Sequence, residues 1–141
     1  MPILVEVSKG LLTQEGEREV FPKIAAALLE AHGLTGNSFM TPNVIGHVSV
    51  KPESECFVGG KSQSLAVVEV TVPAITFPNG QVAQKFIGEV TDIIDTYKAK
   101  PHPRERTYVV VKHAVDGPWG IGGKAYSNAD LGAAIQKAAM A

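Results

Sequence analysis

The chain has 141 residues, 45% of them apolar and 19% charged, which is typical of one globular domain and excludes a disordered or fibrous chain. Its 13 basic and 14 acidic residues give a net charge of −1, which argues against nucleic acid or an anionic membrane as a partner. The single cysteine, Cys56, excludes an intramolecular disulfide, and Glu6 and Lys9 come too early for a signal peptide. We therefore expect a protein of the reducing cytoplasm.

In the first half of the chain, the β-branched apolar residues at positions 3, 5 and 7 alternate with Leu, Glu and Ser at positions 4, 6 and 8, the period of a strand with two unlike faces. Thr13 is predicted to cap a helix whose apolar positions recur at helical spacing as far as Gly33, a natural terminator. Pro22 either kinks this helix or marks the first turn of its main part. Residues 44–50 are predicted to form a second strand.

The second half of the chain repeats this order. Residues 65–72 are predicted to form a strand, residues 82–97 carry an apolar helical stripe, and residues 107–112 form a fourth strand. The tail that follows is predicted to end in a short helix, opened by a capping box between Ser127 and Asp130.

Three pairs of matching segments at one spacing indicate that these two halves are an internal repeat. In each pair the second segment comes 63 residues after the first, as in 68 − 5 = 63. The pairs are Val5–Val7 with Val68–Val70, Thr13 with Thr76, and Gly59–Lys61 with Gly122–Lys124. We therefore divide the single domain 1–141 into pseudo-repeats 1–63 and 64–126 and a C-terminal tail, 127–141.

The predicted fold class is α/β (α+β), with two tandem β-α-β units. A strand–helix–strand unit with parallel strands takes a right-handed crossover, so two units give a four-stranded sheet with both helices on one face. Strands as apolar as these are not expected to leave the other face in water, which predicts a homo-oligomer. Glu6 and Glu69 are then expected near that inner surface as solvated strand charges.

Two short motifs carry a family resemblance. Met1-Pro2-Ile3 at the opening and Trp119–Lys124 (WGIGGK) at the close resemble the tautomerase superfamily, and the closing segment resembles the hairpin of 4-oxalocrotonate tautomerases. Segments 31–36 and 57–60 resemble the cis-3-chloroacrylic acid dehalogenase subgroup, whose members are fused double units. The resemblance implies a tautomerase/MIF-like fold and a homotrimer.

Pro2 is the catalytic residue that this resemblance implies. The catalytic group of the superfamily is the secondary amine of an N-terminal proline, exposed when the initiator methionine is removed. The second repeat has Leu65 at the matching place. A free α-amino group titrates near ~8, and burial lowers that pKa towards the range useful for proton transfer from carbon. If Met1 stays attached, the Pro2 nitrogen is an amide and cannot act as a base.

The remaining pocket residues are expected to hold the carboxylate of a small-molecule substrate. The small tautomerases use two arginines, whose places fall here at residues 11–12 and at Tyr108, with Arg106 two residues away on the same face. The resemblance matches Trp119 to an aromatic beside the hairpin, and His32 to a histidine of the dehalogenase subgroup that helps bind the carboxylate. Lys112 shares the face of Arg106 and Tyr108. The alternative reading of these residues is structural: strand-face and core positions, and a histidine that satisfies helix-end carbonyls.

Missing groups favour tautomerisation over hydrolytic dehalogenation. The arginine pair of the dehalogenase subgroup is absent from residues 70–77, and its water-activating glutamate falls near Pro118. The four histidines show no metal-ligand spacing, and we expect no metal or cofactor. The favoured function is keto–enol proton transfer on a 2-keto acid. Two alternatives remain: a hydratase, dehalogenase or decarboxylase type of lyase that uses the same proline, and a non-catalytic oligomer that keeps the scaffold.

Overall fold

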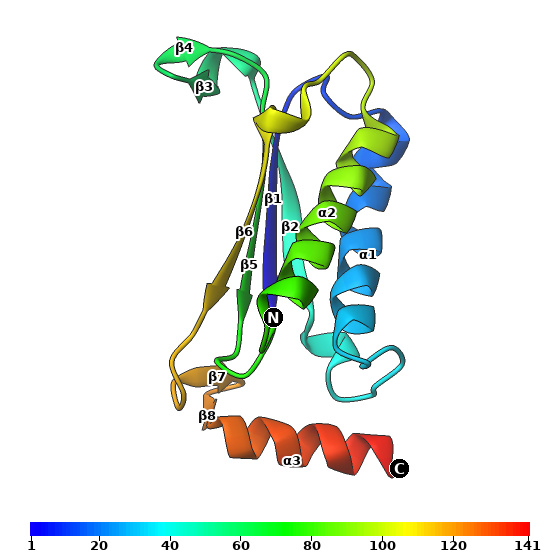
Figure 1. The fold of residues 1–141 in the computed structure, drawn as a ribbon, viewed down its shortest axis with the longest axis vertical. Helices are drawn as coiled ribbons and strands as arrows, with labels where there is room; N and C mark the ends of the chain where they lie inside the picture. The colour runs from blue at the N-terminus through cyan, green and yellow to red at the C-terminus, as the bar shows by residue number, and fades with distance from the viewer.

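The structure, a computed structural model, describes residues 1–141 and contains two successive β-α-β units (Figure 1). The first unit comprises β1 (Pro2–Ser8), α1 (Gln14–Ala31) and β2 (Ile45–Lys51), and the second comprises β5 (Ala66–Val72), α2 (Gly80–Tyr97) and β6 (Thr107–His113). Each unit is followed by a hairpin, formed by β3 (Phe57–Val58) with β4 (Lys61–Ser62) and by β7 (Trp119–Ile121) with β8 (Lys124–Tyr126). Helix α3 (Asn128–Ala139) ends the chain, and three short 3-10 turns lie at Thr41–Asn43, Glu53–Glu55 and Arg104–Arg106.

The main sheet has four strands in the order β2-β1-β5-β6. Within each unit the two strands are parallel, whereas β1 and β5 pair antiparallel at the centre. In that central pair Val5 lies opposite Val68, its repeat partner. The predicted four-stranded sheet of two tandem units is therefore confirmed.

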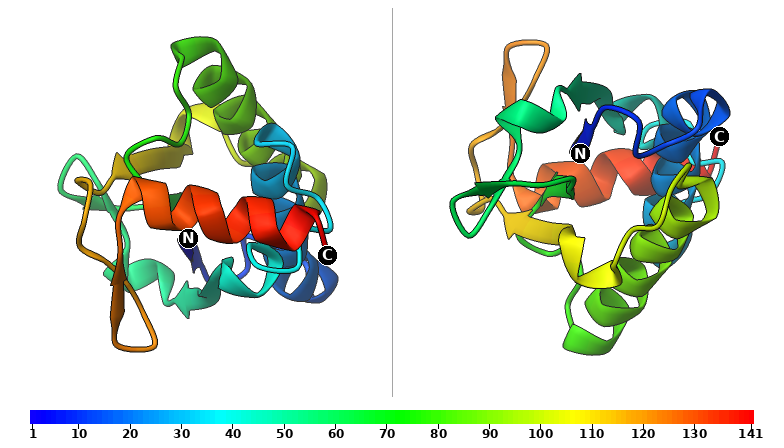
Figure 2. Two further views of the ribbon diagram at one scale, coloured as in Figure 1. Left: turned by 90° about the horizontal axis from the view of Figure 1, so that it is seen from below. Right: turned by 90° about the horizontal axis from the view of Figure 1, so that it is seen from above.

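Helices α1 and α2 cover one face of this sheet, as predicted, and lie side by side (Figures 1 and 2). The alternation in β1 decides which residues they bury: Ile3 and Val5 are fully buried, whereas Leu4 and Glu6 are exposed. Residues of both helices, Phe86 among them, complete one continuous apolar core with the inward valines of β5. Burial of this kind is the main source of folding free energy.

The uncovered face of the sheet is mixed in character. Tyr108 is 65% exposed there, and Leu4 and Val110 are also exposed. Between them stand Glu69 and Lys112, which form an ion pair of 3.0 Å. Because half of each valine run points into the core, the bare face is less apolar than the strand sequences suggest.

The helix ends confirm the capping predictions. Thr13 Oγ1 accepts a hydrogen bond of 2.9 Å from the N–H of Gly16, and Gly33, with φ of +63°, follows the end of α1. The capping box of Ser127 with Asp130 is present at the start of α3. Pro22 lies inside α1, so it does not mark the start of the helix.

One anchor of the predicted repeat is wrong. The residue that caps α2 is Asn79, not Thr76, so the helix caps are 66 residues apart (79 − 13) rather than 63. The loop between β5 and α2 is longer than its counterpart in the first unit. It packs inward, with Thr76 buried and its carbonyl oxygen accepting a bond of 2.7 Å from His113 Nε2.

Helix α3 crosses one end of the sheet, beside the N-terminus (Figure 2). Leu131 of α3 is buried, and the side-chain amide of Asn37 donates to the carbonyl oxygen of Ile135, also in α3, at 3.1 Å. These contacts tie the tail to the loop that follows α1. None of the helices combines the length and the hydropathy needed to cross a membrane.

Candidate active site

The N-terminus lies within the fold. The side chain of Met1 belongs to the core, and the residue is only 3% exposed. Its amino group donates to the carbonyl oxygen of Asn43, and its own carbonyl oxygen accepts from the N–H of Ile45 at 3.2 Å. Met1 thus extends the pairing of β1 with β2 by one residue, and Pro2 is the first residue of β1.

Burial changes the acidity of this chain end. Desolvation lowers the pKa of the Met1 amino group from 8.0 to about 6, because water no longer stabilises the charged form. An amine with such a pKa is mostly uncharged at neutral pH. This end of β1 therefore favours a neutral amine, the state that a base requires.

Pro2 lines a pocket of about 400 Å³ at the same end of the sheet. Trp119 and the glycine-rich turn after it form another wall, so the structure brings Pro2 and Trp119 together, whereas no charged side chain lines this pocket. The lining residues are Met1, Pro2, Asn43, Ile45, Thr71, Ala114, Pro118, Trp119, Gly120, Ile121 and Gly122.

The hairpin that carries Trp119 owes its shape to two glycines. Gly122 and Gly123 have φ of +60° and +84°, the left-handed pair that a tight two-residue hairpin turn requires. The turn allows Trp119 to pair with Tyr126, while its indole packs against the core and remains half-buried. The pocket wall is therefore set by local sequence and is anchored to the main domain.

Arg106 and Tyr108 lie in a different pocket of the chain. With Leu65, Phe57 and Glu105 they line a cavity of about 290 Å³ beside the β3–β4 hairpin. Leu65 precedes β5, which runs antiparallel to β1, so this cavity lies at the opposite end of the sheet from Pro2. Within one chain, the expectation that these two residues share a pocket with Pro2 is not met, because antiparallel pairing separates the two strand starts.

Lys112 lies nearer to Pro2 than Arg106 does. In the parallel ladder of β5 and β6 it stands beside Thr71, which lines the Pro2 pocket. Its ammonium group donates to Glu69 Oε2 at 3.0 Å. Lys112 is therefore the predicted cation closest to the Pro2 end of the bare face, although it is not itself part of the pocket wall.

His32 makes two hydrogen bonds to the backbone. Its Nε2 accepts from the N–H of Phe77 at 3.1 Å, so the proton of the neutral ring is on Nδ1, which donates to the carbonyl oxygen of Leu28 at 2.9 Å. The ring also packs edge-on against Phe77, with centroids 4.5 Å apart. Both nitrogens of His32 thus join the end of α1 to the β5–α2 loop, which leaves neither of them free for a carboxylate.

Replacing His32 with alanine should therefore act on stability more than on substrate binding. The change leaves the Phe77 N–H without its acceptor and removes the ring contact, at an expected cost of about 1–3 kcal/mol. Chemical denaturation measures the free energy of unfolding, and the KM of the folded variant should stay near that of the unaltered protein. A large rise in KM without a loss of stability would support the carboxylate-binding reading instead.

Among the residues of the Pro2 pocket that sequence reasoning missed are Asn43, Ile45 and Thr71. Their positions depend on the register of β1 with β2 and on the antiparallel pairing of β1 with β5. The predicted strand at 44–50 was the only signal for Ile45. No local motif marks any of the three as a pocket residue.

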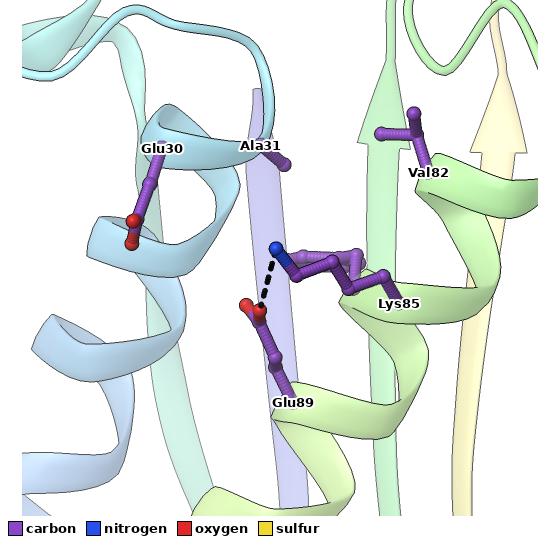
Figure 3. A pocket seen from close by; sticks show the side chains of 6 residues that line it. Glu30, Ala31, Val82, Lys85 and Glu89 are labelled. Atoms are coloured by element: carbon purple, nitrogen blue, oxygen red, sulfur yellow. Dashed lines mark ion pairs between the residues drawn. The ribbon is translucent and has the colours of Figure 1, made fainter.

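A third surface hollow, of about 170 Å³, lies between α1 and α2 (Figure 3). Glu30 comes from α1, and Lys85 and Glu89 come from α2 and lie 3.9 Å apart as an ion pair. No group of three or more His, Cys, Asp and Glu side chains in the chain is placed to hold a metal ion. The pocket at Pro2 is the candidate active site, because it holds the residue that the family resemblance implies as catalytic together with Trp119.

No protein-family model matches the sequence, and neither does any curated protein sequence. The fold does match solved structures. A wild-type symmetric trimer of fused 4-OT has a TM-score of 0.72 at 14% identity, covering 94% of this chain and 99% of that one. Malonate semialdehyde decarboxylase inhibited by 3-bromopropiolate has a TM-score of 0.64 at 11% identity, covering 86% and 89%.

Macrophage migration inhibitory factor from Toxoplasma gondii has a TM-score of 0.63 at 14% identity, covering 89% of this chain and all of that one. These structures share the α+β architecture of strands and helices described above, over most of their length. The resemblance predicted from the sequence is therefore confirmed at the level of the fold: this chain has the fold of the tautomerase superfamily, in its fused double form.

Proposed function

We propose that the mature chain begins at Pro2 and that its ring nitrogen is the general base and acid of a tautomerase-like isomerase. The reaction moves a proton between carbon and oxygen in a 2-keto acid or a related small carboxylate. The observation that carries the proposal is the pocket that Pro2, the first residue of β1, shares with Trp119. Burial at the same chain end lowers the pKa of the Met1 amino group, which supports it. Such a site favours a neutral amine, which is the form that accepts a proton from an enol or a carbon acid.

We also propose that the working form is a homotrimer. The bare sheet face with its exposed Leu4, Tyr108 and Val110 supports an assembly, and fused 4-OT with the same fold forms trimers. Within one chain Lys112 is the candidate for attracting the substrate carboxylate. Arg106 and Tyr108 would serve a Pro2 pocket only from a neighbouring subunit, since their own end of the sheet has Leu65 in place of proline.

Two measurements test this function. Intact mass of the purified protein shows whether Met1 has been removed, which the proposal requires. Ultraviolet absorbance then follows the ketonisation of two substrates, phenylenolpyruvate and a simple enolised 2-keto acid. The proposal would be overturned by a protein that has lost Met1 and in whose presence both enols still ketonise at the uncatalysed rate.

The pH dependence of kcat/KM should report the pKa of the Pro2 amine. A base works when it is unprotonated, so the rate should rise with pH through the pKa of Pro2 and then level off. Burial of this chain end lowers the pKa of the Met1 amine to about 6, and the same burial should hold that of Pro2 below the usual ~8. We expect a plateau already at pH 7.5. A rate that still climbs steeply above pH 8 would contradict a desolvated base.

Two other functions have some support. The fold likeness to malonate semialdehyde decarboxylase favours a lyase that uses the same proline, and trapping of an imine with borohydride would identify it. The tight packing of Met1, whose amino and carbonyl groups are both hydrogen-bonded, favours a non-catalytic scaffold that retains it. Retention of Met1 in the intact mass would identify that case.

A further inference from the structure

The edge strand β2 offers two backbone groups to the N-terminus. The N–H of Ile45 donates to the carbonyl oxygen of Met1 at 3.2 Å, and the carbonyl oxygen of Asn43 accepts from the Met1 amino group. Both residues also line the pocket of Pro2. In the chain with Met1 attached, these groups are therefore already bonded.

Removal of Met1, on which the proposed function depends, frees both groups at once. The carbonyl oxygen of Met1 is bonded to the carbon that carries the Pro2 nitrogen, so covalent geometry places it roughly 2.3 Å from that nitrogen. An oxygen atom of a bound molecule that takes its place can accept from the Ile45 N–H. It then lies within hydrogen-bond distance of the proline amine, a little farther out than the covalent oxygen.

The proposed reaction requires a hydrogen-bond donor in this pocket, and the Ile45 N–H is such a donor. Enol chemistry places negative charge on an oxygen, and a fixed backbone N–H stabilises that charge without reorganising. No charged side chain lines the pocket, and the side-chain amide of Asn43 is already bonded to the carbonyl oxygen of Phe39 at 2.7 Å. Ile45, as the residue level with Pro2 in the ladder, presents its N–H beside the reacting amine.

We propose that the backbone N–H of Ile45 binds the 2-oxygen of the substrate in the mature protein. In ketonisation, the Pro2 nitrogen removes the proton of the enol hydroxyl and leaves an enolate, with its negative charge on the oxygen. The oxygen–carbon bond then becomes a carbonyl while the electron pair of the carbon–carbon double bond takes the same proton from the proline ammonium at carbon 3. The Ile45 N–H holds the oxygen throughout and stabilises its charge between the two transfers. This assignment rests on the proposed function and names the group that orients its substrate.

Ile45→Pro tests the assignment, because it removes this one N–H. Proline is tolerated at the first residue of an edge strand, and Val44, with φ of −92° and ψ of 102°, already has an extended backbone suited to a following proline. Ile45→Ala removes the side chain and keeps the N–H, so the ratio of the two variants isolates the backbone donor. We expect kcat/KM of Ile45→Pro to be about 10²-fold below that of Ile45→Ala.

The pH profile and nuclear magnetic resonance give readouts that a merely structural effect would not move. The pH midpoint of Ile45→Pro should stay in place. If it shifts while the plateau rate is kept, the N–H donates to the Pro2 nitrogen instead, which overturns the assignment. In ¹⁵N-labelled mature protein, pyruvate should move the Ile45 amide proton downfield, whereas a chain that keeps an N-terminal extension before Pro2 should show no such shift.

The two proposals fail in different ways. If pyruvate does not shift the Ile45 amide signal in a protein that turns over enols, the assignment of Ile45 is overturned and the proposed isomerase activity stands. If pyruvate shifts the Ile45 amide signal downfield in a protein that does not turn over enols, the binding role of Ile45 is supported and the proposed isomerase activity is overturned. Equal kcat/KM for Ile45→Pro and Ile45→Ala likewise overturns the assignment.

Discussion

A chain that keeps an N-terminal extension before Pro2 is expected to lose ~10³-fold in kcat/KM, the middle of the range that one general acid–base group contributes. The extension turns the ring nitrogen into an amide, whose lone pair is delocalised into the carbonyl and does not accept a proton. The extension also leaves a carbonyl oxygen on the N–H of Ile45, as Met1 does in the structure. Ketonisation of phenylenolpyruvate measures the loss, and intact mass verifies each chain end.

The matched control carries the same extension after Ala141, which is exposed. It should keep the activity of the untagged protein, because the C-terminus lies beyond the end of α3. Pro2→Ala, once Met1 is removed, retains a primary amine and should fall between the two. Full activity in the N-terminally blocked chain would show that the reaction does not use the proline nitrogen.

Gly46→Ala is expected to destabilise the protein by at least ~3 kcal/mol, at the upper end of overpacking substitutions. A Cβ atom at this position would lie 1.8 Å from the carbonyl oxygen of Ile3 and 2.7 Å from a ring carbon of Phe21. The oxygen belongs to β1, so it cannot retreat without disturbing the pairing of β1 with β2. Because Ile45 and Pro2 depend on the same pairing, the activity should fall along with the stability.

Gly88→Ala is the control for this substitution. Gly88 lies within α2, and a Cβ there would meet nothing within 4 Å. Alanine should raise the free energy of unfolding by roughly 0.5–1 kcal/mol, because it is the better helix former. Urea unfolding followed by circular dichroism compares the two variants. If the urea midpoint of Gly46→Ala is as high as that of the unaltered protein, β1 and β2 separate easily at this point and the prediction is wrong.

Local features were predictable from the sequence because each depends on neighbouring residues. Thr13 caps α1 through the N–H of Gly16, three residues on, and the Gly122–Gly123 turn needs no distant partner. The repeat spacing failed at Thr76 because the β5–α2 loop is longer, and the extra length is absorbed by packing against other parts of the chain. Insertions of this kind leave no mark in a pattern of apolar residues.

The site was predictable only in part. Pro2 and Trp119 are 117 residues apart (119 − 2), and a resemblance rather than any spacing suggested that they meet. The structure places them in one pocket, and it places Arg106 and Tyr108 in another. The backbone groups of Asn43 and Ile45 were invisible to sequence reasoning, since every residue carries an N–H or a carbonyl and only position distinguishes them.

By itself, the sequence determined the four main strands, the helices and the caps of α1 and α3, because alternation and helical periodicity act over a few residues. Tertiary structure alone decided which strand ends meet. The antiparallel pairing of β1 with β5 sends Pro2 and Leu65 to opposite ends of the sheet, and the parallel register of β1 with β2 sets Ile45 beside Pro2. Register is a property of hydrogen bonds between segments far apart in the chain, and a local pattern of side chains decides only which face of a strand is buried.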